Sequence, residues 1–123
     1  MKTILVLDDD SIFRRIISQY LKQAGYAVIE ESSGKQVINQ VLKHSPCACF
    51  VDIIMDDKEG LETIEELNQL TEKPIIVAVS SDQQYLEWAK DFGADFLLLK
   101  PIAVQKVDQI LAVISNKLLD SVS

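Results

Sequence analysis

Five short apolar runs alternate with longer segments in which apolar residues recur every three or four positions. The runs span residues 3–7, 26–30, 48–52, 75–79 and 95–99. Continuous apolar runs of this length are typical of strands that helices cover on both faces of a sheet. The pattern therefore predicts an α/β fold of five strand–helix units, with one parallel sheet, right-handed crossovers and helices on both faces. The second run is more polar, which suits an edge strand.

Capping residues mark where the helical segments begin and end. Ser11 is expected to cap the first helix, which Gly25 ends. Asp82 is expected to cap the fourth helix, which Gly93 ends. The first and fifth helices carry apolar stripes at helical spacing, and both stripes are expected to face the sheet. They comprise Phe13, Ile16, Ile17, Tyr20 and Leu21 in the first helix and Val104, Val107, Leu111, Ile114 and Leu118 in the fifth.

The fourth helix has more apolar positions than one buried stripe requires. We expect Leu86, Ala89 and Phe92 to pack inward. Tyr85 and Trp88 would then remain partly exposed, and such aromatic side chains are either ordinary surface or anchors of an interface.

Length and charge restrict the class of protein. The 123 residues suit a single domain, residues 1–123, and the net charge of −7 argues against binding to nucleic acid or an anionic membrane. No apolar run has the length of a membrane span, and the first residues do not resemble a signal peptide, so a cytoplasmic location is expected. Cys47 and Cys49 lie within one strand and are expected to be buried, reduced thiols.

Reactive polar residues follow four of the five strands. Asp8 and Asp9 follow the first strand, Asp52 ends the third, Ser80 follows the fourth and Lys100 follows the fifth. Each has an ordinary explanation as a turn residue, a helix cap or a solvated cation. The carboxyl ends of parallel strands, however, meet at one edge of the sheet, where ligands bind in such folds. The pattern therefore predicts that these side chains converge.

The converging groups suit phosphoryl chemistry. Three carboxylates held close together repel one another unless a cation neutralises them. Mg²⁺ prefers oxygen ligands, takes few protein carboxylates and retains waters and phosphate oxygens. A hydroxyl and an ammonium group beside the cation would suit the oxygens of a phosphoryl group.

The chain resembles the response-regulator receiver domains of two-component signalling, including the chemotaxis regulators, from residue 4 to residue 119. The resemblance implies a doubly wound, flavodoxin-like (βα)5 domain with strand order 2-1-3-4-5. The matching residues are Leu7-Asp8-Asp9, Asp52 with Gly60 eight residues later, Ser80-Ser81, Gly93-Ala94-Asp95 and Lys100-Pro101.

The resemblance also implies roles for individual residues. It makes Asp52 the phosphoacceptor and one of the Mg²⁺ ligands. Asp9 would bind Mg²⁺ directly, Asp8 mainly through water, and the backbone carbonyl of Ile54 would complete the protein's ligands.

Two further residues would act on the phosphoryl group. Lys100 resembles the lysine that pairs with the phosphate, and its bond to Pro101 is expected to be cis. Ser80 resembles the switch hydroxyl, although Ser81 remains possible because the segment before Gly93 is about two residues short of the family's pattern.

Other positions depart from that pattern. Asp56 stands where the family usually has Pro, and Glu59 where Asp is common. Leu97 replaces the Tyr or Phe that often rotates during switching. Phe96 cannot substitute for it, because successive strand side chains point to opposite faces.

The resemblance implies a signalling switch rather than an enzyme with turnover. A sensor histidine kinase or a histidine phosphotransfer protein would supply the phosphoryl group. The surface of the fourth helix, fifth strand and fifth helix would then change, and a downstream protein target or a second copy in a homodimer would recognise it.

Two alternatives compete with this hypothesis. Asp8 and Asp10 resemble the nucleophile and acid of haloacid-dehalogenase-type phosphatases. That hypothesis gives Asp52 no task and needs more chain for a substrate cap. A dimerisation module that works without phosphorylation is the other alternative, and the complete acidic set argues against it.

Overall fold

The structure is a computed structural model, and it describes residues 2–54 and 60–122, with side chains described up to residue 117. The strands are β1 (Thr3–Leu7), β2 (Ala27–Glu31), β3 (Ala48–Asp52), β4 (Ile75–Ser80) and β5 (Phe96–Leu99). The α-helices are α1 (Ser11–Gln23), α2 (Val37–His44), α3 (Gly60–Asn68), α4 (Gln83–Phe92) and α5 (Val104–Val122), and a short 3-10 helix, η1 (Gly34–Gln36), precedes α2. Asp56 and Glu59 lie outside the described residues.

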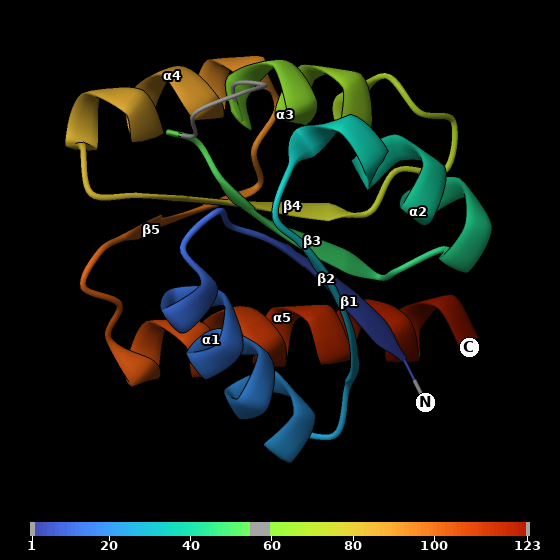
Figure 1. Cartoon of the computed structure of the whole chain (residues 1–123). Coiled ribbons are helices and arrows are strands. Elements are labelled where there is room, and N and C mark those ends of the chain that lie inside the picture. The colour runs from blue at the N-terminus through green and yellow to red at the C-terminus, as the bar shows by residue number, and fades with distance from the viewer. Residues whose placement is uncertain (1, 55–59, 123) are drawn as a thin grey trace.

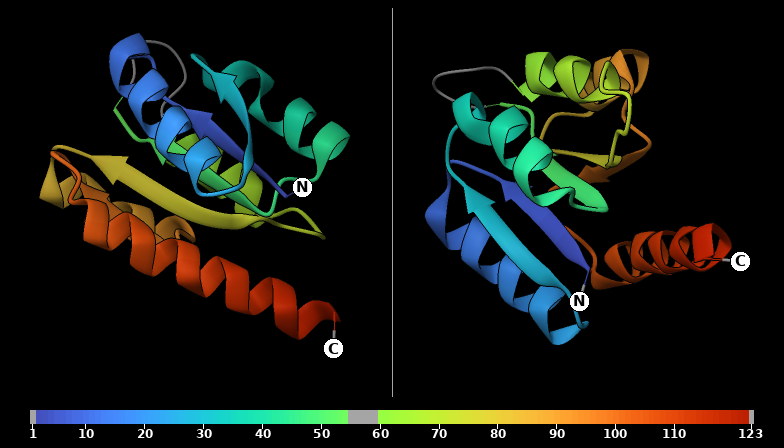
Figure 2. Two further views of the ribbon diagram at one scale, coloured as in Figure 1. Left: turned by 90° about the horizontal axis from the view of Figure 1, so that it is seen from below. Right: turned by 90° about the vertical axis from the view of Figure 1, so that its right-hand side faces the viewer.

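The strands form one parallel sheet in the order β2-β1-β3-β4-β5, as the resemblance implied. Helices α1 and α5 cover one face, and α2, α3 and α4 cover the other (Figure 1). The side view in Figure 2 shows the resulting three layers. The polar second strand lies at one edge of the sheet, as expected, and β5 lies at the other.

The sheet is buried on both faces, which explains its continuous apolar strands. Alternate residues of one strand enter different halves of the core: Val6 packs on the side of α1 and α5, and Leu5 on the side of α2, α3 and α4. Phe50 and Cys49 repeat this alternation in β3. Burying an aliphatic or aromatic side chain of this size contributes about 1.5 to 3 kcal/mol.

Three of the four residues expected to cap or end a helix do so in the structure. Asp82 caps α4 by accepting hydrogen bonds from the backbone of Gln84 and Tyr85, and Gly93 ends that helix with φ 118°. Gly25 follows α1 with φ 101°. The expectation for Ser11 was wrong: Asp10 is the cap, because its side chain already accepts from the first free amides of α1.

Among the expected core residues whose side chains are described, three are exposed instead; Leu118 lies outside the described side chains. Ile16 is 63% exposed and Val104 is 52% exposed, because both line an open groove between α1 and the start of α5. Phe92 is 38% exposed. Leu86 and Ala89 define the buried face of α4. Because a helix turns once every 3.6 residues, Phe92 lies about 90° around the helix axis from the centre of that face.

Cys47 and Cys49 are both free thiols, as expected, although Cys47 is only partly buried. No helix among residues 2–54 and 60–122 is long and apolar enough to cross a membrane.

Candidate functional site

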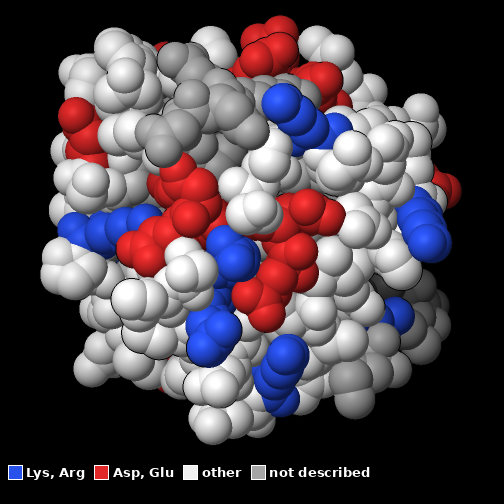
Figure 3. Space-filling model, viewed as in Figure 1, with Lys and Arg blue, Asp and Glu red and all other residues white. Residues whose placement is uncertain are grey.

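The strand register brings the predicted residues to the same edge of the sheet. Leu7 pairs with Val51, so Asp8 lies abreast of Asp52. Carboxylate oxygens of Asp8, Asp9 and Asp52 all lie within 4.8 Å of one another. On the face of the molecule that Figure 3 shows, acidic side chains gather in the middle, with basic side chains beside them.

Asp8 is the most enclosed member of this cluster, with 1% of its surface exposed. Its Oδ1 accepts a hydrogen bond of 2.9 Å from the backbone of Asp10, and its Oδ2 accepts one of 3.1 Å from Lys100 Nζ. Its backbone carbonyl accepts a 2.7 Å bond from Arg14, which also pairs with Glu30 at 3.3 Å. These contacts fix the end of β1 between α1, β2 and β5.

Asp52 is buried at the end of β3, with 6% of its surface exposed. Burial raises the pKa of its carboxyl group to about 7, and the negative charge of Asp8 adds to the rise, while Lys100 opposes it. Lys100 Nζ lies 3.9 Å from Asp52 Oδ2, beyond hydrogen-bond distance. Without a cation, this carboxyl group therefore retains its proton to a much higher pH than an ordinary aspartate does.

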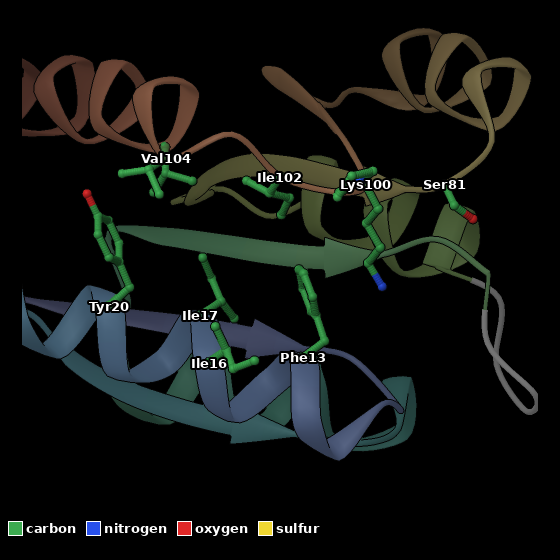
Figure 4. Close-up of a pocket in the computed structure, with 10 residues that line it drawn as sticks. Phe13, Ile16, Ile17, Tyr20, Ser81, Lys100, Ile102 and Val104 are labelled. Atoms are coloured by element: carbon green, nitrogen blue, oxygen red, sulfur yellow. The ribbon is translucent and has the colours of Figure 1, made fainter.

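Ser80 and Ser81 have different environments. Ser80 is 1% exposed, and its Oγ accepts a 3.0 Å hydrogen bond from the backbone of Asp82, the cap of α4. Its backbone carbonyl accepts a 2.8 Å bond from the backbone of Lys100, which joins the ends of β4 and β5. Ser81 is exposed, and its hydroxyl points away from Lys100 (Figure 4).

The Lys100–Pro101 peptide bond is cis, as expected. Beside it a groove of about 510 Å³ opens between α1 and the start of α5 (Figure 4). The groove is lined by Phe13, Ile16, Ile17, Tyr20, Ser81, Lys100, Pro101, Ile102, Val104 and Val107.

Sequence reasoning missed two residues near the site. Phe13 contacts the ammonium group of Lys100, and Arg14 holds the carbonyl of Asp8. Their places on α1, four and five residues after Asp9, put them on the first turns beside the site. This spacing could have predicted that both residues lie near the site, but Phe13 was assigned only to the apolar stripe that faces the core.

Gly60, the first residue of α3, lies directly against the backbone at the end of β3. Its amide donates a 2.9 Å hydrogen bond to the carbonyl of Ile53. A Cβ atom at this position would lie 2.9 Å from the carbonyl carbon of Asp52 and closer still to its oxygen. Only glycine therefore allows α3 to begin directly against the backbone of Asp52.

We expect Gly60→Ala to lower the free energy of unfolding by about 3 kcal/mol, because the methyl group forces the start of α3 away from β3. Gly25→Ala is the matched control. Nothing lies within 4 Å of the added Cβ, so only the strain of φ +101° remains, about 1 kcal/mol. Urea unfolding of both variants measures the difference. Equal losses would show that Gly60 is not packed against the backbone of Asp52.

The donor set fits Mg²⁺. Asp8, Asp9 and Asp52 offer three carboxylates within one ion's reach, and Asp9 is exposed, which leaves a side open for water and phosphate oxygens. Burial of two of these carboxylates makes a compensating cation favourable.

Comparison with known proteins places this site in a family. A model of the response regulator receiver domain matches residues 4–112. The chain belongs to the response regulator receiver domain family. A receiver domain from Methylobacillus flagellatus, described as CheY-like, superposes with a TM-score of 0.83 at 25% identity, covering 93% of this chain and 98% of that one. A two-component response regulator from Clostridium difficile gives 0.86 at 20% identity, over 96% and 98%, and supports the fold alone.

The curated relatives that match this chain are longer than it is. The response regulator ArlR of Staphylococcus epidermidis is 28% identical over 87% of this chain and 49% of its own length. The transcriptional regulatory protein PdtaR of Mycobacterium tuberculosis is 26% identical over 84% and 51%. A cyclic di-GMP phosphodiesterase of Thermotoga maritima is 26% identical over 84% of this chain and 28% of its own. This chain thus spans about a quarter to a half of these relatives.

Proposed function

We propose that this receiver domain is a phosphorylation-dependent switch that accepts a phosphoryl group on Asp52. The donor is the phosphohistidine of a sensor histidine kinase or a histidine phosphotransfer protein. The observation that carries the proposal is the placement of Asp52, which is buried among Asp8, Asp9 and Lys100 at the edge where the strands end. Response regulators as a family receive signals from histidine kinases, so we propose a protein of this kind as the partner of this chain.

The transfer exchanges one bond to phosphorus for another. A carboxylate oxygen of Asp52 attacks phosphorus while the bond to the imidazole nitrogen breaks, and the electron pair of that bond returns to the imidazole. Lys100 lies 3.9 Å from Asp52 and contributes positive charge beside the transferring oxygens. Ser80 directs its hydroxyl proton to a phosphoryl oxygen once the acyl phosphate has formed.

Mg²⁺ bound to these residues would neutralise the negative charge of the phosphoryl oxygens during transfer. Asp8, Asp9 and Asp52 would hold it, with the backbone carbonyl of Ile54. Asp52 must lose its proton to act, and a cation in this cluster favours the ionised form of the carboxyl group.

The output surface comprises α4, β5 and α5. Ser80 Oγ contacts the cap of α4, so movement of the hydroxyl toward a phosphoryl group reaches that helix directly. On α4, Trp88 is 44% exposed and packs edge-on against Tyr85, with ring centroids 5.0 Å apart. The surface also includes a hollow of about 370 Å³ lined by Phe96, Leu97, Leu98, Lys106, Gln109, Ile110 and Val113. A downstream protein or a second copy of the chain recognises this surface.

Trp88 fluorescence tests the switch. We expect its emission to change when Mg²⁺ and beryllofluoride, which stands in for the phosphoryl group, are added together, and to stay constant with either alone. The change in emission should vanish in Asp52→Asn. In Ser80→Ala it should weaken about threefold or more, because the lost hydroxyl contact contributes about 1 kcal/mol to the free energy that favours the switched state.

Ser81→Ala is the matched control and should respond as the wild type does, since the Ser81 side chain is exposed and its hydroxyl points away from Lys100. A response lost in Ser81→Ala and kept in Ser80→Ala would assign the switch to the other serine. A constant signal in the wild type would contradict an output through α4.

The alternative functions have less support. Asp10, the acid in the phosphatase hypothesis, is exposed, and its side chain caps α1. A dimerisation module without phosphorylation would have no use for a buried carboxylate beside Lys100. The net charge of −7 supports protein partners rather than nucleic acid or a membrane surface, and we place the switch in the cytoplasm.

A further inference from the structure

Phe13 contacts the ammonium group of Lys100 at the end of the groove nearest the site. The Nζ atom lies 4.1 Å from the centre of the Phe13 ring. The two side chains come from α1 and from the end of β5 and point toward one another (Figure 4). The negative face of an aromatic ring attracts a cation, more strongly where water is excluded, and the Lys100 side chain is only 23% exposed.

Three side chains of the described part of the chain lie close to the ammonium group, and a bound metal ion would affect them differently. Asp8 Oδ2 accepts its hydrogen bond at 3.1 Å, and Asp52 Oδ2 attracts its charge at 3.9 Å. Both carboxylates belong to the proposed metal site, so a bound cation competes for them and repels the ammonium. Phe13 is the only one of the three that keeps its full attraction when the carboxylates are occupied.

We infer that Phe13 is a positioning residue that holds Lys100 beside Asp52 while the carboxylates bind Mg²⁺. The inference rests on the proposed role of Lys100 in pairing with the phosphoryl group. Lysine has a long, flexible stem that can turn toward solvent when its partners weaken. The ring has less freedom, because Phe13 is partly buried and packs against the core on the side of α1 and α5. An aliphatic side chain would fill the same space without attracting the ammonium.

Nuclear magnetic resonance of the Lys100 ε-methylene group tests the contact itself. Protons over the face of an aromatic ring resonate upfield, so we expect an upfield displacement in the wild type, with and without Mg²⁺. Phe13→Leu should abolish it, and Phe13→Tyr should restore it. Tyr20→Leu is the matched control, because Tyr20 lines the same groove from the same helix but bonds to Asp108. A Lys100 resonance that is unchanged in Phe13→Leu would overturn the inference.

Phosphorylation by acetyl phosphate tests the consequence. We expect Phe13→Leu to slow the reaction about threefold to tenfold, in proportion to a cation–π contact in a partly shielded site. Phe13→Tyr should restore the rate. In a Lys100→Met background, Phe13→Leu should cause no further loss, since the two residues act through one contact.

An equal loss in both backgrounds would show that Phe13 acts through the fold and would overturn positioning. A wild-type rate for Lys100→Met would contradict the proposed role of Lys100, and the resonance of Lys100 would still decide whether Phe13 holds the ammonium.

Discussion

Replacing Lys100 with methionine is expected to slow phosphorylation of Asp52 by acetyl phosphate about 100-fold, the loss typical of removing one charge-stabilising group from a transition state. Methionine keeps an unbranched stem in the groove and removes the charge. Lys100 Nζ lies 3.9 Å from Asp52 Oδ2 and 3.1 Å from Asp8 Oδ2, so its positive charge lies directly beside the carboxylate that we propose as the phosphoacceptor. The rate is measured from the mass increase over time in saturating Mg²⁺.

Lys106→Met is the matched control, because Lys106 is exposed on α5 and the two substitutions change the net charge equally. It should leave the rate unchanged. Comparable losses in both variants would mean that overall charge, rather than the position of Lys100, governs the reaction.

Removing the charge of Asp52 is expected to stabilise the protein when no metal is present. The pKa of the Asp52 carboxyl group is raised from 3.8 to about 7, so the folded state binds this proton more tightly than the unfolded state. The corresponding stability is present below pH 4 and is lost as the pH rises through 7. Asp52→Asn should therefore match the wild type at pH 4 and exceed it at pH 8 by about 2 kcal/mol, about half of what the full shift corresponds to.

Chemical unfolding in a chelator at both pH values measures this difference. Asp91→Asn, at an exposed position on α4, is the control for removing one negative charge from the protein. Adding Mg²⁺ should stabilise the wild type more than Asp52→Asn, because only the wild type offers the third carboxylate. An Asp52→Asn variant that gains nothing between pH 4 and pH 8 would contradict the raised pKa of Asp52, and with it the cost of burying this charge beside Asp8.

The fold was predictable from the sequence because the sheet is buried on both faces. Such burial requires continuous apolar strands, and the predicted runs 3–7 and 48–52 coincide with β1 and β3. The order of the strands came from the family resemblance, since alternation of strands and helices does not specify it. Convergence of Asp8, Asp9 and Asp52 followed from the parallel arrangement, because every strand ends at the same edge.

Details that depend on side-chain direction were less predictable. Asp10 and Ser11 are both good caps, and only the backbone shows that Asp10 accepts the bonds from Ile12 and Phe13. Ile16 fits the apolar stripe of α1 by spacing but faces an open groove, because α5 does not close over that side. The contact between Phe13 and Lys100 joins residues 87 positions apart, so no local pattern could reveal it.

The most direct test of the central claim is the intact mass of the protein after incubation with Mg²⁺ and acetyl phosphate. We predict that the wild type gains one phosphoryl group, that chelating the metal prevents the gain, and that the modified residue is Asp52. Asp52→Asn should gain none. Equal labelling of the wild type and Asp52→Asn, or no labelling of a wild-type protein shown to be folded, would contradict the account.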